Sequence, residues 1–388
     1  MGAKELKTSL AGLWGDVVAG AAEETPSLRT APESESRSLL GKLITPAPAH
    51  LTAAFLYQQD CEASLWTRAH KKGAEEMGKA LASQVDILHY DHADSPEAAE
   101  TLLDRAVSDG ADLIFTTTPL MLQPALKAAV RYPKLRILNC SVDTALSSVR
   151  SYYCRAYEGK FITGLIAGAM AKNDLIGYVG SYPILGVPAS LCAFAIGARM
   201  TNPRARILLE WSCVPGNAAE RLASRGARII SNRDLPMKDT GLFESGEYGT
   251  CFLDDDGRMQ PLASPVWLWD RVYEQVVRSV LSGSWTQKKE GEAINYYWGM
   301  DSGAIDVEMT GLVPEGPAAL ARHMISALQE GRFDPFRCRI LAQDGSIKND
   351  GSHGFTPLDL LRMDWLPENV EGRIPDFDEL APISQPLV

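Results

Sequence analysis

Short apolar runs alternate with helix-like segments between residues 51 and 254. The runs "LTAAFLY", "VDILHY", "ADLIFTTT" and "LRILNCS" are typical of strands, and the segments between them space their apolar residues as helices do. The pattern resumes in "YEGKFITGLIAGAMAKNDLIGYVGSYPI", where a helix rich in small residues leads into a buried strand. Strands and helices that alternate in this way form parallel sheets with helices on both faces. The sequence therefore predicts an α/β protein.

The number of strands favours two lobes over one sheet. We expect roughly four strands before Ser141 and at least four between Leu175 and Asp254, too many for one sheet of usual size. Two doubly wound lobes in succession are the simplest arrangement. Ligands of such sheets bind beyond the carboxyl ends of the strands. We therefore expect a ligand cleft between the lobes, with residues 180–183 at one wall.

Composition excludes several classes of protein. The chain has 388 residues, enough for two domains, and its formal charge of −11 argues against nucleic-acid or anionic-membrane partners. No apolar run reaches the roughly 18 residues of a membrane-spanning helix. The seven cysteines form no CxxC pair. We therefore expect them to be small buried hydrophobic residues and not metal ligands or disulfides, which fits a reducing compartment.

The first residues do not resemble an export signal. They lack a continuous apolar stretch, and the first cysteine is Cys61, so a lipid-acceptor cysteine near the start is missing. These features predict either a cytoplasmic protein or a chain from which an export segment has been removed, and they leave localisation open.

Several longer segments resemble one protein family in their order and spacing. They are "ADLIFTTTPLMLQPALKAAVRYP", "YEGKFITGLIAGAMAKNDLIGYVGSYPI", "AFAIGARMTNPRARI", "SPVWLWDRVYEQVVRSVLSGSW" and "YYWGMDSGAIDV" followed by "VPEG". Between about Leu51 and Trp365 the chain resembles the basic membrane protein family, the PnrA-like and Med-like substrate-binding proteins of bacterial ABC transporters.

The resemblance implies a fold, a ligand and a partner. The fold is the type I periplasmic-binding-protein fold, two doubly wound parallel-sheet lobes joined by three crossovers with the ligand cleft between them. The ligand is a purine nucleoside, a nucleobase or a related aromatic heterocycle, and an ABC permease is the partner. The family is lipoprotein-like, works at the outer face of the plasma membrane and is not enzymatic, and no cofactor or metal is implied.

We expect the following division of the chain. Residues 1–50 form an N-terminal helix or irregular arm and linker, and residues 366–388 form a C-terminal tail. Lobe 1 comprises residues 51–152 and 263–285, and lobe 2 comprises residues 153–262 and 286–365.

The resemblance also carries a set of ligand-binding residues. Trp66 stands where the family has an aromatic residue that stacks on the base, but Ala63, Ser64 and Leu65 replace the usual acidic and glycine residues before it. The other positions follow later strands, and they are Thr116, Thr117, Thr118, Trp211 (or Ser212), Asn232, Asp234 and Asp255. Phe252-Leu253 departs from the family pattern before Asp255. These departures make a shifted specificity plausible.

These residue types suit a purine, and each also has a structural interpretation. A purine offers two apolar faces and a polar rim, so two indoles and a few acceptors would bind it. Alternatively, Trp66 is core packing at a helix start, and residues 254–257 are a surface turn. We interpret Trp267 and Trp269 as packing or crossover residues.

Three functions remain open. The first is a solute-binding protein that captures a purine nucleoside or base for an ABC-type uptake system. The second is a cytosolic nucleoside-sensing regulator with the same fold, and the third is a nucleoside-processing enzyme. The third is disfavoured because the sequence has no GxxxxGK[ST], GxSxG or HExxH motif and no GxGxxG after the first strand.

Overall fold

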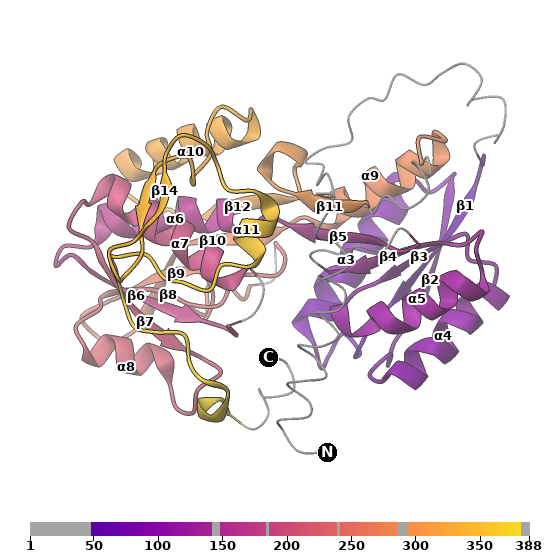
Figure 1. Cartoon of the computed structure of the whole chain (residues 1–388), viewed down its shortest axis with the longest axis horizontal. Coiled ribbons are helices and arrows are strands. Elements are labelled where there is room, and N and C mark those ends of the chain that lie inside the picture. The colour runs from indigo at the N-terminus through magenta and orange to yellow at the C-terminus, as the bar shows by residue number, and fades with distance from the viewer. Residues whose placement is uncertain (1–47, 142–147, 184–185, 239–240, 286–293, 382–388) are drawn as a thin grey trace. The chain divides into compact units, whose positions relative to one another are not determined.

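The chain divides into two compact units, each described here by itself (Figure 1). The computed structural model describes residues 48–141, 148–183, 186–238, 241–285 and 294–381, so the predicted arm of residues 1–50 lies almost wholly outside it. Unit 1 comprises Met1–Tyr153 and Tyr273–Tyr297, and unit 2 comprises Cys154–Val272 and Trp298–Val388. The chain therefore passes between the units three times, as the resemblance implied.

Unit 1 is built on a six-stranded sheet in the order β11-β5-β4-β3-β1-β2. Its strands are β1 (Leu51–Leu56), β2 (Val85–Tyr90), β3 (Leu113–Thr116), β4 (Arg136–Cys140), β5 (Arg150–Cys154) and β11 (Asn295–Trp298). Its helices are α3 (Leu65–Ala80), α4 (Pro96–Ser108), η1 (Pro119–Met121), α5 (Leu122–Arg131) and α9 (Trp269–Leu281). Strands β1 to β5 pair in parallel, as the alternation predicted.

Helices cover both faces of this sheet because neighbouring residues of a strand point to opposite sides. Ala54, Leu56 and Ile114 face a buried cluster that includes residues of α4 and α5. Phe55 and Phe115 face the other side, where the ring of Tyr273 from α9 lies 4.8 Å from each of them, measured between centroids. The doubly wound character of unit 1 thus follows from apolar residues at successive strand positions.

Unit 2 is built on a seven-stranded sheet in the order β12-β10-β9-β8-β6-β7-β15. Its strands are β6 (Leu175–Gly180), β7 (Arg206–Trp211), β8 (Ile229–Ser231), β9 (Thr250–Leu253), β10 (Met259–Trp267), β12 (Ile305–Met309) and β15 (Val370–Glu371). Its helices are α6 (Ala156–Met170), α7 (Val187–Thr201), α8 (Ala218–Ser224), η2 (Met300–Ser302), α10 (Glu315–Gln329), α11 (Pro357–Leu361) and η3 (Phe377–Glu379). A separate two-stranded sheet contains β13 (Arg339–Leu341) and β14 (Ile347–Asp350).

Helices α6 and α7 cross with their backbones in contact. A Cβ atom added to Gly164 would overlap the carbonyl oxygen of Phe194, and one added to Gly197 would overlap that of Phe161. The small residues of the α6 sequence therefore serve this crossing, because only residues without a long side chain let two helices approach so closely. Phe161, Leu165 and Ile166 of the same helix are fully buried.

Three expectations about unit 2 require correction. Strand β9 is antiparallel to β8, so the sheet is parallel only around β6, β7, β8 and β15. Residues 263–267 belong to β10 in unit 2, not to lobe 1, because β10 pairs with β9 and β12. Residues 294–297 belong to unit 1 and not to lobe 2, because β11 lies beside β5.

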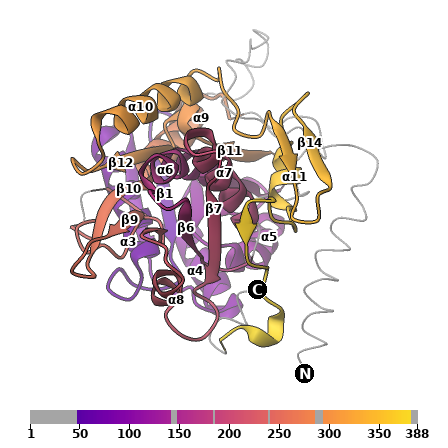
Figure 2. The same ribbon diagram turned by 90° about the vertical axis from the view of Figure 1, so that its left-hand side faces the viewer.

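The predicted C-terminal tail is also part of the fold. Val370 and Glu371 form β15 and pair in parallel with β7, as Figure 2 shows. Leu380 is buried as well. This segment escaped prediction because a two-residue strand has no periodicity of its own.

The α6–α7 crossing predicts that an alanine is destabilising at the glycines where the two helices touch, but not at a glycine that faces open space. Gly164→Ala and Gly197→Ala should each lower the free energy of unfolding by about 1–3 kcal/mol, because the added methyl group has to displace a backbone carbonyl. Urea unfolding followed by circular dichroism measures the change.

The matched control is Gly316→Ala at the start of α10, where an added Cβ meets no atom within 4 Å. This substitution should leave stability unchanged or raise it slightly. Equal effects at the three positions would contradict the close crossing.

Candidate functional site

Trp66 is held in one orientation at the start of α3. Ser64 caps the helix by accepting a hydrogen bond from Thr67 N, which places Trp66 in its first turn. The indole Nε1 donates to the carbonyl oxygen of Thr117 over 2.9 Å. The ring meets His70 edge-on, with 4.6 Å between the centroids. Trp66 is only half-buried, so part of its surface remains open at the carboxyl end of the unit 1 sheet.

The aromatic groups beneath Trp66 are neutral. His70 is buried and forms a hydrogen bond with the hydroxyl of Tyr273, and burial lowers the pKa of His70 well below its usual value. His89 Nδ1 lies 2.9 Å from the hydroxyl of Tyr57, and burial is the main cause that lowers the pKa of His89. This end of unit 1 therefore combines aromatic surface and uncharged polar groups with a partly exposed ion pair between Lys71 and Asp91.

The three threonines of the predicted site play different roles. The hydroxyl of Thr116 donates to Leu138 O over 3.3 Å, and that of Thr117 donates to Leu56 O over 2.8 Å. Both side chains are buried, so they join neighbouring strand ends. The hydroxyl of Thr118 is buried and has no hydrogen-bond partner in the part of the chain that the structure describes. Thr118 is therefore the threonine that retains free bonding capacity.

In unit 2, Asp234 is paired with a buried lysine that sequence analysis missed. Lys160 Nζ lies 2.5 Å from Asp234 Oδ1 and donates to Ser231 Oγ over 3.1 Å. The ammonium also lies 4.9 Å from the centroid of the Tyr178 ring. The side chains of Lys160 and Asp234 are only 4% and 17% exposed. Burial raises the pKa of Asp234, although the Lys160 ammonium acts to lower it.

A signal for Lys160 exists in the sequence. It is the one charged residue between Glu158 and Lys172, in a stretch that otherwise consists of apolar and small residues and Thr163. A cation buried on such a helix requires an anionic partner. The partner itself lies 74 residues further along the chain, so local patterns cannot identify it.

Asn232 and Asp234 follow β8 at the carboxyl edge of the unit 2 sheet. Asn232 N donates to Gly249 O over 2.7 Å, and its side chain is half-buried. Strand β10 runs antiparallel to β9 and therefore in the same direction as β8, so it ends at this edge too. Val266, near the end of β10, forms a bridge with Leu235. Trp267 at the end of β10 is 9% exposed, which agrees with the packing role expected for it.

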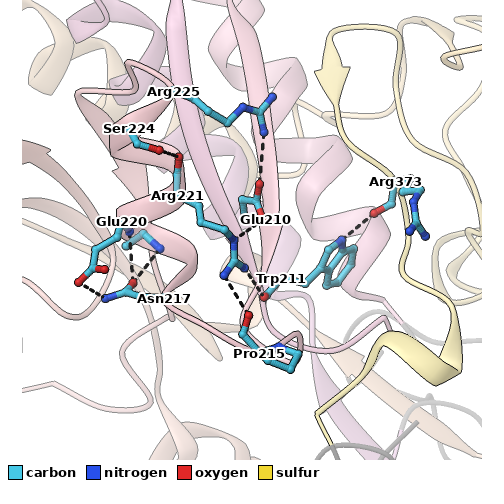
Figure 3. Close-up of polar contacts among 10 residues, drawn as sticks. Glu210, Trp211, Pro215, Asn217, Glu220, Arg221, Ser224, Arg225 and Arg373 are labelled. Atoms are coloured by element: carbon cyan, nitrogen blue, oxygen red, sulfur yellow. Dashed lines mark hydrogen bonds and ion pairs between the residues drawn. The ribbon is translucent and has the colours of Figure 1, made fainter.

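Trp211 is buried by packing, so the structure does not support its predicted stacking role. Its ring lies on Gly180, where an added Cβ would come within 2.6 Å of the indole, and it is only 5% exposed. Its Nε1 donates to the carbonyl oxygen of Arg373 over 2.8 Å (Figure 3). Arg221, paired with Glu210 at 2.8 Å, donates to the carbonyl oxygen of Pro215 and fixes the loop that follows Trp211. The C-terminal segment thus provides the hydrogen-bond partner of the buried indole.

Asp255 lies at the opposite edge of the sheet from Asp234. Because β9 is antiparallel to β8, the turn after β9 returns to the amino end of β8, and Asp255 pairs there with Arg228 at 2.7 Å. The Asp255 side chain is fully exposed. The structure therefore does not support its assignment to the ligand site, and it agrees with the interpretation of residues 254–257 as a surface turn.

The described residues show three further features relevant to function. They contain no group of three or more His, Cys, Asp or Glu side chains that could hold a metal ion. Within the same ranges, no helix has the length and apolar character needed to cross a membrane. None of the seven cysteines, all of which lie in the described ranges, is in a disulfide, and five of them are buried, as predicted.

The buried pair in unit 2 predicts a pH-dependent loss of stability. Lys160→Met removes the ammonium and leaves Asp234 without its partner, so the free energy of unfolding at pH 7 should fall by about 3–5 kcal/mol. Since burial raises the pKa of Asp234, the folded state favours the protonated carboxyl. The loss should therefore be full above the raised pKa and shrink as the pH falls through it. Urea titrations at pH 7 and at a series of lower pH values measure it.

Two controls accompany this variant. The double variant Lys160→Met/Asp234→Asn should recover most of the lost stability at pH 7, because no charge remains buried. Asp255→Asn should leave stability unchanged, because its ion pair is exposed. A double variant as unstable as Lys160→Met alone would show that the pair is not the cause.

Comparisons with known proteins agree with this architecture. Residues 50–214 match the family described as "ABC transporter substrate-binding protein PnrA-like". A purine-binding protein from Brucella abortus is 26% identical over 80% of this chain and 90% of its own length. A putative ABC transporter glucose-binding protein from Haloferax volcanii is 28% identical over 65% of each chain.

Solved structures share the fold. A transcriptional activator of the comK gene from Bacillus halodurans superposes with a TM-score of 0.59 at 17% identity, over 73% of this chain and 99% of its own. An ABC transporter solute-binding protein from Conexibacter woesei has a TM-score of 0.55 at 16% identity, over 73% and 98%. The type I periplasmic-binding-protein fold is confirmed, and residues 50–214 are similar to the PnrA-like substrate-binding proteins of ABC transporters, as the sequence motifs predicted.

Proposed function

We propose that this chain is a solute-binding protein that captures a purine base, a purine nucleoside or a related aromatic heterocycle for an ABC-type uptake system. The family match supports the general role. The purine-binding relative from Brucella abortus, similar along most of both chains, supports the ligand class. The observation that carries the proposal is the fixed, half-buried indole of Trp66 at the carboxyl edge of the unit 1 sheet.

Trp66 has the properties of a stacking surface for a flat ring. Its hydrogen bond to Thr117 and its contact with His70 fix the indole before any ligand arrives, so little side-chain entropy is lost on binding. Stacking of a nucleobase on an aromatic side chain contributes about 1–3 kcal/mol. The neutral His70 beneath the ring adds no charge that would select for an ionic ligand.

Asn232 and Asp234 are the proposed polar ligand contacts of unit 2. Lys160 stabilises the carboxylate form of Asp234, which can only accept hydrogen bonds. The amide of Asn232 can both donate and accept. Ring N–H groups, exocyclic amines and ribose hydroxyls are suitable partners for such groups. A few polar groups of this kind are part of what a purine site requires.

Substitution of Trp66 tests the proposal directly. Trp66→Ala should weaken the binding of adenine or adenosine by roughly 5- to 150-fold, the equivalent of about 1–3 kcal/mol of stacking. Trp66→Phe should retain part of the affinity, because a smaller ring still stacks. Isothermal titration calorimetry against adenine, hypoxanthine, adenosine, inosine and guanosine measures both.

The matched control is Trp365→Ala. Trp365 is half-buried like Trp66, but it packs against Phe355 and Lys348 in the C-terminal part of unit 2. This variant should bind the same ligands with unchanged affinity. If wild-type protein binds none of the five compounds more tightly than millimolar, the proposed ligand class is wrong.

We further infer that the protein releases its ligand chemically unchanged, in keeping with its solute-binding relatives. Adenosine and inosine incubated with stoichiometric protein should be recovered intact by liquid chromatography. The appearance of free base or of a deaminated product would show an enzyme instead.

A further inference from the structure

Asn139 near the end of β4 is held with one polar atom unused. Its side chain is fully buried, and Nδ2 donates to Thr116 Oγ1 over 2.7 Å and to the carbonyl oxygen of Thr118 over 2.9 Å. A backbone carbonyl only accepts, so the amide nitrogen has to face Thr118, and this fixes the orientation of the amide. Oδ1 has no hydrogen-bond partner among the described residues.

Two hydroxyl groups near Asn139 share this property. Ser141 is 3% exposed, and its Oγ has no partner in the described part of the chain. The buried hydroxyl of Thr118 likewise has none there. Ser141 N donates to Asn139 O over 2.9 Å, and the carbonyl of Thr118 accepts from Asn139, so these bonds join the three residues. Folded proteins rarely leave one buried polar atom without a partner, and here three lie on joined segments.

The same segments hold Trp66. Its Nε1 donates to Thr117 O, one residue before Thr118. β3 and β4 are neighbours in the sheet, with Thr116 opposite Asn139, so both segments leave the sheet at its carboxyl edge. The unused polar atoms therefore belong to the stretch of chain that carries the proposed stacking residue.

We propose that Asn139 Oδ1, Ser141 Oγ and Thr118 Oγ1 form a polar subsite that binds an uncharged N–H or O–H donor of the ligand. The amide oxygen only accepts, and the hydroxyl groups accept or donate, so a donor satisfies the set. None of the three side chains carries a charge, so the subsite suits an exocyclic amine or a sugar hydroxyl better than a phosphate or a carboxylate. The choice of ligand rests on the proposed function.

The alternative is that these three atoms do not contact the ligand and have only a structural role, for example by binding an ordered water. The two interpretations predict opposite effects on stability. Removing a hydroxyl that has no partner relieves a cost of burial, whereas removing one that is bonded to water loses a bond.

Ser141→Ala and Thr118→Val test the proposal, because neither removes a side-chain hydrogen bond that the described structure shows. The urea midpoint of the ligand-free protein should stay unchanged or rise for each. The affinity for the donor-bearing probe should fall roughly 2- to 10-fold for each, the size of one neutral hydrogen bond. The control is Ser108→Ala on the exposed side of α4, which should change no affinity.

Three probes identify the donor. A loss for adenine but not for unsubstituted purine assigns the donor to the amine. A loss for adenosine but not for adenine assigns it to the sugar. The proposed subsite is overturned if both variants keep the wild-type affinity for every probe that the wild-type protein binds. It is also overturned if both variants have a lower urea midpoint. If the wild-type protein binds no probe, the proposed function fails, and the urea midpoints still decide about the subsite.

Discussion

The crossing of α6 and α7 sets the position of the polar groups in unit 2. Gly164 and Gly197 bring the two backbones into contact, and on another side an added Cβ at Gly159 would lie 2.7 Å from Pro265 Cβ of β10. Helix α6 therefore cannot slide or rotate without steric overlap. Lys160 in its first turn is carried to the end of β8, where the ammonium meets Ser231 and Asp234. The close packing of α6 thus fixes the position of the buried ion pair between Lys160 and Asp234.

The carboxyl edges of the two sheets differ in chemical character. The edge in unit 1 has a fixed indole, two histidines whose pKa burial lowers, buried hydroxyl and amide groups, and a partly exposed ion pair between Lys71 and Asp91. The edge in unit 2 has a buried ion pair. Flat apolar surface and uncharged polar atoms recognise shape and hydrogen-bond pattern, whereas a carboxylate recognises donors more strongly.

The sequence predicted local structure well and long-range structure less well. The parallel strands β1 to β4 follow from local pattern, and this prediction is confirmed. The direction of β9 depends on the strand with which it pairs, and an apolar run of four residues does not specify that strand. Because β9 was expected to be parallel, Asp255 was placed at the carboxyl edge of the sheet instead of the opposite edge. The burial of Trp211 depends on Arg373, 162 residues away. Such contacts leave no periodic signal.

Strand β15 has a consequence for how the sheet of unit 2 meets other molecules. Without it, β7 would present a row of unpaired backbone groups, the kind of border along which chains stick together and form fibrils. Val370 and Glu371 occupy that border, and Ala381 N also donates to Cys213 O. These C-terminal residues therefore cover part of the edge of β7, along which strands of neighbouring copies would otherwise be able to pair.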